Sequence, residues 1–218
     1  MSLTLHFHPL SSFCHKALIA LYENDIPFER RIVNLGDPAD ASVFKKLWPV
    51  GQFPVLRDNA KNRTIPESSI IIEYLDQDYP GKTRFVPADP NLALQVRLKD
   101  RFYDLHVQVP MQKVVGDRLR AEGRKDPHGV EQATARLQVA LDMIDAEMAG
   151  KSWAVGNIFT MADCAAAPAL FYADKVIPLG DKHKNAAGYL RRLLDRPSYA
   201  RIIEEAKPYF AMFPGNRV

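Results

Sequence analysis

The sequence of 218 residues predicts an α/β unit followed by an all-helical unit. Strand and helix patterns alternate over residues 1–80, a proline-rich break follows, and only helical patterns appear after Asn91. Apolar residues make up 47% of the chain, which is enough to build a real core.

Seven elements are expected in the first unit, in the order β-α-β-α-β-β-α. The first helix is indicated by Cys14, Ala17, Leu18 and Leu21, which follow the i, i+3, i+4, i+7 spacing of one helix face. Short apolar runs bounded by Pro, Asp and Asn predict the strands. The expected strands span residues 3–8, 28–35, 53–56 and 63–65, and the expected helices span residues 14–21, 43–48 and 68–78.

The break between the units holds three prolines and one glycine within residues 79–90. This composition is typical of a stiff, turn-rich linker. We therefore expect a first domain at residues 1–80, a linker at 81–90 and a helical domain at 91–218. The helical patterns cover residues 92–122, 129–148, 160–174, 186–194 and 198–206.

The bulk composition excludes several classes of protein. A net charge of +3 is too small to indicate a nucleic-acid partner. The N-terminus has no charged segment followed by an apolar run, and the longest small-and-apolar stretch, 164–173, is too short to span a bilayer. His6 and His8 share one face of a strand but have no third ligand at metal spacing. We expect a cytoplasmic protein with no membrane or nucleic-acid partner and no metal.

The first segment that carries chemistry is SSFCHK, residues 11–16, between the first strand and the first helix. A helix start presents unpaired N–H groups and a partial positive charge, which favour a thiolate. A serine hydroxyl here can donate a hydrogen bond to a bound thiolate, or Ser11 or Ser12 can simply cap the helix. Cys14 fits either a buried position on the apolar stripe or a reactive thiol in an S-x-x-C pattern.

Two further segments offer contacts for an extended ligand. In residues 51–56 (GQFPVL), Pro54 opens a strand, and a cis bond before it would turn the backbone of Phe53 towards a ligand. Glu67 and Ser68 stand at the start of a helix, where Ser68 suits a carboxylate and Glu67 suits an ammonium group. An ordinary trans proline and ordinary helix capping are the simpler alternatives.

The order and spacing of these segments resemble those of the cytosolic glutathione transferases, and the resemblance extends over nearly all of the chain. Within that family the sequence is most similar to a serine-type bacterial member. That family places Ser, Tyr or Cys just after the first strand, then an x-Pro strand start, then an acidic-Ser pair. This sequence has Ser11, Phe53-Pro54 and Glu67-Ser68 at those places.

The helical half carries two further points of resemblance. Phe159 to Asp163 (FTMAD) is similar to the family's capping box, in which Thr160 caps a helix and Asp163 reaches back to it. Arg196-Pro197-Ser198 before the last helix also fits the family.

The resemblance implies a thioredoxin-like first domain that binds glutathione as a co-substrate. Its cysteine would pair with the backbone of Phe53, its γ-glutamyl end would meet Glu67 and Ser68, and Ser11 would stabilise the thiolate. The implied glutathione-binding residues are Ser12, Phe13, Gln52, Phe53, Pro54, Glu67 and Ser68. The electrophile would lie against Tyr103, His106, Val107 and Pro110, whose helical spacing also fits core packing.

The reaction is less closely defined than the binding. Ser11 and Ser12 compete for the catalytic role. A Ser-Ser start also resembles the maleylacetoacetate isomerase class, but that class continues with Ser-Ser-Cys-Ser and Phe13 stands here. We expect a homodimeric glutathione S-transferase that conjugates glutathione to small hydrophobic electrophiles in detoxification. A glutathione-dependent isomerase and a non-catalytic ligand-binding protein are the alternatives.

Overall fold

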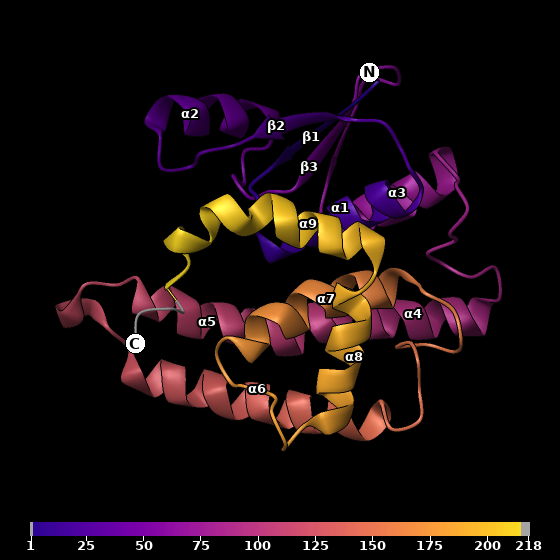
Figure 1. The fold of residues 1–218 in the computed structure, drawn as a ribbon. Coiled ribbons are helices and arrows are strands. Elements are labelled where there is room, and N and C mark those ends of the chain that lie inside the picture. Colours follow the sequence, from indigo (N-terminus) through magenta and orange to yellow (C-terminus); the bar gives the residue numbers. More distant parts are fainter. Residues whose placement is uncertain (1, 215–218) are drawn as a thin grey trace.

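A computed structural model describes residues 2–214 of the chain. The first half is a four-stranded sheet with helices on both sides, in the expected element order (Figure 1). The strands run in the spatial order β2-β1-β3-β4, with β1 parallel to β2 and the other pairs antiparallel. Its elements are β1 (Leu3–Phe7), α1 (Ser12–Glu23), β2 (Glu29–Ile32), α2 (Pro38–Leu47), β3 (Val55–Asp58), β4 (Arg63–Pro66) and α3 (Ser68–Asp78).

The alternation of side chains along β1 explains where the sheet builds its core. Leu3, Leu5 and Phe7 are fully buried on the face that α1 and α3 cover. The predicted stripe on α1 is buried along its whole length, so α1 lies in the middle of the molecule. The edge strand β2, by contrast, carries Glu29, Arg30 and Arg31 and is exposed, which discourages further strand pairing.

Helix α2 begins five residues before the helix that the apolar pattern predicts. Asp37 caps it by accepting the N–H of Ala39 at 2.9 Å, and Pro38 stands at its first position. These start signals decide the boundary, because only Phe44 is buried on this helix. Phe44 forms a separate small cluster with Val33 and Val55.

The second half is helical, as expected. The stretch expected as one helix over residues 92–122 is divided into α4, a π-helical segment and α5, because its hydrogen bonds change register within a continuous apolar pattern. Its elements are α4 (Pro90–Phe102), the π segment (Tyr103–Gln108), α5 (Val109–Arg118), a 3₁₀ turn (Glu122–Arg124), α6 (Pro127–Glu147), α7 (Met161–Asp174), α8 (Lys184–Leu194), α9 (Pro197–Ala206) and a 3₁₀ segment (Lys207–Met212).

The capping box at the start of α7 is confirmed. The carboxylate of Asp163 accepts the N–H of Thr160 at 2.8 Å and its hydroxyl at 3.0 Å. It also accepts the N–H of Ala154 at 2.8 Å and the hydroxyl of Tyr189 at 2.5 Å. One buried carboxylate therefore joins α7, the loop before it and α8.

The two halves share one hydrophobic core. The main cluster of buried residues runs from β1 through α1 and α3 into α7 and α8. Figure 1 shows α1, α3 and α9 as a layer between the sheet and the helices α4 to α8. No helix within residues 2–214 is long and apolar enough to cross a membrane.

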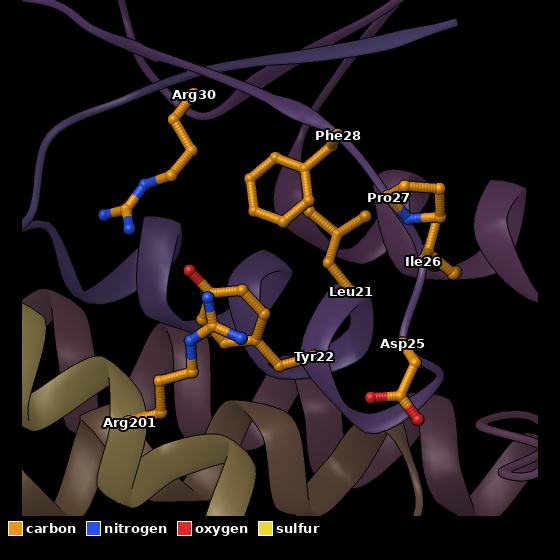
Figure 2. A pocket seen from close by; sticks show the side chains of 8 residues that line it. All are labelled: Leu21, Tyr22, Asp25, Ile26, Pro27, Phe28, Arg30 and Arg201. Atoms are coloured by element: carbon orange, nitrogen blue, oxygen red, sulfur yellow. The ribbon is translucent and has the colours of Figure 1, made fainter. Parts of the chain in front are cut away.

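Helix α9 returns to the first half and packs beside α1 and β2. Figure 2 shows Arg201 of α9, Tyr22 of α1 and Arg30 of β2 around a cavity of about 300 Å³ at this junction. The carboxylate of Glu205 joins them: one oxygen lies 3.0 Å from Arg30 and 3.0 Å from Arg201, and the other accepts the hydroxyl of Tyr22 at 2.8 Å.

Candidate functional site

The structure brings six of the seven sequence-predicted binding residues, all but Ser12, together around one cavity of about 110 Å³. They come from three separate segments: the start of α1, the loop before β3 and the start of α3. The sheet places these segments side by side, because β1 and β3 are neighbouring strands and α3 follows β4. The lining residues are Phe13, Gln52, Phe53, Pro54, Glu67 and Ser68.

Ser11 caps α1 and stands two residues before Phe13 of the cavity wall. Its Oγ accepts the N–H of Cys14 at 3.4 Å, so the capping role is real. Accepting that bond leaves the hydroxyl proton available as a donor. Ser11 is partly exposed, whereas Ser12 is buried with 4% of its surface accessible. Of the two candidate serines, Ser11 has the better access to a ligand.

The loop before β3 has a special backbone at two positions. The Phe53–Pro54 peptide bond is cis, and Gly51 has a φ angle of 71°, in the left-handed region that favours glycine. The ring of Phe53 stacks on the imidazole of His8 at 6.0 Å between centroids. Phe53 therefore joins the cavity wall to the end of β1.

Glu67 adopts an unusual backbone conformation at the start of α3. Its φ angle is 67°, a region that costs a non-glycine residue about 1–3 kcal/mol. Its carboxylate makes no capping hydrogen bond, and its carbonyl accepts the N–H of Ile71 at 2.8 Å. Strain of this kind is typical of binding sites, and here it presents Glu67 together with the helix N-terminus at Ser68.

A buried ionic cluster lies directly behind this helix start, and the sequence patterns did not predict it. The ammonium group of Lys16 on α1 is 2.5 Å from Asp100 and 2.8 Å from Asp104, and it donates to Ser69 at 2.8 Å. Burial raises the pKa of Asp104, although Lys16 opposes that shift. The guanidinium group of Arg101 also belongs to the cluster: it donates a hydrogen bond to Ser69 and forms ion pairs with Asp100 and Asp104.

This cluster fixes the start of α3 against α4 and the π segment. Its two carboxylates belong to the helical second half of the chain and its lysine belongs to the first half, so only the folded chain brings them together. A possible signal in the sequence is the lysine itself, which stands inside the apolar run CHKALIAL of α1.

Cys14 is a packing residue in this structure. It is fully buried, and burial raises the pKa of its thiol to about 12. A thiol with this pKa is almost entirely protonated at neutral pH, which makes it a poor nucleophile.

The four residues expected along the electrophile pocket differ in their exposure. Tyr103, Val107 and Pro110 are buried in the helical half, and Tyr103 and Val107 expose 2% and 0% of their surface. His106 is exposed and lies against the ring of Phe102, with 5.4 Å between ring centroids.

Comparisons with known proteins agree with this architecture. Residues 5–83 match the model of the glutathione S-transferase N-terminal domain, and residues 127–192 match that of the C-terminal domain. The glutathione S-transferase U22 of Arabidopsis thaliana is 30% identical over 164 residues, which are 74% of this chain and 68% of the relative. This chain belongs to the glutathione S-transferase family. The match to the glutathione S-transferase-like protein LUC7 of a Fusarium species, also 30% identical, covers 60% of this chain and spans 58% of the relative's length.

Solved glutathione S-transferases share the whole fold. One from Methylobacillus flagellatus, with glutathione bound, superposes with a TM-score of 0.85 at 23% identity, covering 92% of this chain and 98% of the other. One from Methylobacterium radiotolerans, in complex with glutathione sulfonate, gives a TM-score of 0.81 at 26% identity, covering 92% and 94%. The family fold therefore extends across both halves of this chain.

Proposed function

We propose that this chain binds glutathione in the 110 Å³ cavity and conjugates its thiolate to small hydrophobic electrophiles. The observation that carries the proposal is the meeting of Phe53, Glu67 and Ser68 in one cavity, whose wall also includes Phe13 at the start of α1, the helix that Ser11 caps. The family members of known structure that bind glutathione or glutathione sulfonate support the choice of ligand. The proposed binding domain is residues 1–80, joined by a linker at 81–90 to the helical domain at 91–218.

Each part of glutathione has a suitable partner in this arrangement. The γ-glutamyl carboxylate would bind at the N-terminus of α3, at Ser68, and its ammonium group would bind the carboxylate of Glu67. The cysteine would pair with the backbone of Phe53 as an added strand. Ser11 would donate its hydroxyl proton to the thiolate and thereby favour the ionised form of the nucleophile.

The charges near the cavity favour conjugation over isomerisation of a diacid. A cavity of about 290 Å³ adjoins the first one at Glu67 and contains Arg97 and Arg101. Arg97 is already paired with Glu73 at 2.8 Å, and Arg101 is paired with Asp100 and Asp104. Two arginines neutralised in this way are poor partners for a substrate with two carboxylates.

Replacement of Ser11 by Ala tests the proposal. Loss of one donor to a developing or bound anion lowers turnover by about 10²–10³-fold, so we expect kcat to fall by that order. The affinity for glutathione, measured by calorimetry, should stay within about twofold because the other contacts remain. Circular dichroism melts identify any loss of folding, since Ser11 also caps α1.

Ser12→Ala is the matched control, because it removes the neighbouring hydroxyl from a buried position. We expect it to leave kcat unchanged. If Ser12→Ala loses turnover and Ser11→Ala does not, the catalytic role belongs to Ser12. If the wild-type chain binds glutathione but turns over no electrophile in a broad panel, the chain is a binding protein and the conjugation proposal fails.

We also propose that the chain forms a homodimer through an apolar stripe on α4, the π segment and α5. Leu94, Leu98, Leu105 and Val109 expose 68%, 63%, 51% and 49% of their surface at spacings of four, seven and four residues. Ile70 on α3, 53% exposed, lines the cavity that also contains Arg97 of α4. Large exposed apolar residues gathered in this way are typical of interfaces between subunits.

A further inference from the structure

Ser11 stands at the end of a turn formed by residues 8–11, and the side chain of His8, the first residue of this turn, hydrogen-bonds to the backbone of the turn. The N–H of Ser11 donates to the carbonyl of His8 at 3.0 Å and closes the turn. The N–H of Leu10 donates to Nδ1 of the His8 imidazole at 3.2 Å. An imidazole nitrogen that accepts a hydrogen bond carries no proton, so the neutral ring has its proton on Nε2.

Two other side chains hold the turn from outside, and neither depends on pH near neutrality. The carbonyl of Pro9 lies 2.6 Å from Nε2 of His15, and burial lowers the pKa of His15 to about 4. The carbonyl of Leu10 accepts the hydroxyl of Tyr172 at 2.8 Å, and burial raises the pKa of Tyr172. Both side chains therefore keep their donor protons at neutral pH.

The surroundings of His8 are aromatic and uncharged. Its ring stacks on Phe53 with an interplanar angle of 19°, and the ring of Tyr209 from the C-terminal 3₁₀ segment meets it edge-on at 5.8 Å. Tyr209 is the titratable group that faces His8 from these packed segments. Partial burial lowers the pKa of His8, and no charged side chain in the described part of the chain contributes to that shift.

We propose that His8 is a positioning residue for Ser11: its neutral imidazole accepts the N–H of Leu10 and helps to fix the turn that presents the Ser11 hydroxyl, and protonation of the imidazole removes this bond and loosens the turn. The inference rests on the proposed role of Ser11. A second proton on the ring converts Nδ1 from an acceptor into a donor that points at the N–H of Leu10. The Leu10 bond is then lost, and the ring and the amide repel each other.

The proposal predicts that the rate of conjugation falls at low pH for two separate reasons, so that its pH profile has two acid limbs. Ionisation of the glutathione thiol gives one limb, and the titration of His8 adds another. A variant that accepts the Leu10 hydrogen bond but does not titrate should lose only the second limb. Asn suits this purpose, because its Oδ1 accepts from the backbone two residues on and has no proton to gain in this range.

Three variants separate the possible roles of the ring. His8→Asn should keep kcat at pH 8 within about twofold of the wild type and retain a larger fraction of that kcat at pH 5.5. His8→Phe keeps the stacking on Phe53 but removes the acceptor, so kcat should fall about tenfold at every pH with little change in KM for glutathione. His6→Asn is the matched control, because His6 lies on β1 two residues before His8 and packs on Phe44; its pH profile should match the wild type.

A measurement without substrate tests the coupling independently of turnover. The amide signal of Leu10 in NMR spectra should titrate together with the ring of His8 in the wild type and should not titrate in His8→Asn. If the wild type conjugates no electrophile, the function proposed for the site fails, while this titration still decides the coupling. A Leu10 amide that ignores the His8 ring, or a His8→Asn profile that keeps the full acid limb, overturns the proposal.

Discussion

At the scale of single residues, the chain buries several ionisable groups and controls each one through its partners. Lys16 lies between two carboxylates, Cys14 keeps its proton, and His15 stays neutral. An ammonium group buried without such partners would cost several kcal/mol, so the position of Lys16 depends on both carboxylates.

His15 makes the stability of the fold depend on pH. In the unfolded chain its pKa is near the ordinary 6.5, and in the folded chain it is about 4. The unfolded state therefore binds more protons between these values, so the free energy of unfolding is complete above pH 6.5 and falls as the pH drops towards 4. A difference of this size corresponds to about 3 kcal/mol.

Replacement of His15 by Gln should remove this part of the pH dependence. The Gln side chain keeps a donor for the carbonyl of Pro9 but does not titrate. Urea unfolding at pH 7 and pH 4.5 measures the effect. The control is His128→Gln, since His128 is exposed and should leave the pH dependence as it is. Equal losses of stability in the wild type and His15→Gln would contradict the prediction.

The residue types in the sequence predicted the contacts of the site between residues close along the chain, but not those between residues far apart along it. The serine, proline and acidic-Ser signals are local, so Ser11, Pro54 and Glu67 could be chosen from the sequence. The cluster of Lys16 with Asp100 joins positions 84 residues apart. Nothing in the periodicity of α1 or α4 shows which helix the other will meet.

At the scale of elements, capping decides where helices begin, and apolar periodicity decides that they exist. The periodicity predicted α1, α3 and α7 well, because each has a continuous buried face. It placed the start of α2 too late, because the capping signal at Asp37 and Pro38 lies before the first apolar residue. The π segment at Tyr103–Gln108 could not be predicted, since its altered hydrogen bonds leave no mark on the apolar pattern.

The carboxylate of Asp163 should be the most costly cap to lose. Replacement by Asn removes one of two accepting oxygens and leaves donors from Ala154, Thr160 and Tyr189 competing for the other. We expect the free energy of unfolding to fall by about 2–3 kcal/mol, because the unpaired donors are buried. Urea denaturation provides the measurement.

Asp89→Asn is the matched control for this cap. Asp89 caps α4 by accepting the N–H of Leu92 at 2.8 Å, but in an exposed position. Asn is as good an N-cap as Asp, so the change should cost less than about 0.5 kcal/mol. Similar costs at both positions would show that the network around Asp163 adds nothing to ordinary capping.

At the scale of the whole molecule, the two halves are joined by one continuous core. The main hydrophobic cluster crosses from the sheet into the helical half, and α9 packs back on α1. Buried polar contacts reinforce this junction. The carboxylate of Glu23 at the end of α1 accepts both Nε and Nη2 of Arg196, at 2.8 and 2.6 Å, and the hydroxyl of Ser198 at 2.5 Å.

Two glutamates at this junction should differ in their energetic weight. Glu23→Gln disrupts a bidentate pair whose glutamate side chain is 7% exposed, and should lower the free energy of unfolding by about 2 kcal/mol. Glu205→Gln disrupts the contacts of Glu205 with Arg30, Arg201 and Tyr22, and here the glutamate side chain is 22% exposed. It should cost less than about 1 kcal/mol. Urea melts that rank the two variants in the opposite order would contradict this assignment.

The proposed homodimer predicts a mass near twice 24.6 kDa in solution. Leu98→Glu places a charge in the middle of the apolar stripe and should convert the protein to monomers, because the charge would be buried without a partner. Leu119→Glu is the control: Leu119 is equally exposed, at 68%, but lies beyond the stripe at the end of α5. Light scattering during gel filtration measures the mass, and a monomeric wild type would exclude the dimer.

The hydrogen bond from Tyr172 to the carbonyl of Leu10 limits how this chain can be recombined with its relatives. The turn that carries Ser11 comes from the first half, and the tyrosine that holds it from outside comes from the helical half. A chimera that joins residues 1–80 to a foreign helical half without a hydroxyl at this place would keep every local motif of the first half, yet the turn of Ser11 would lack one of its three side-chain hydrogen bonds. The activity of such a chimera would therefore depend on the residue at position 172, which lies far along the chain from the junction of the two halves.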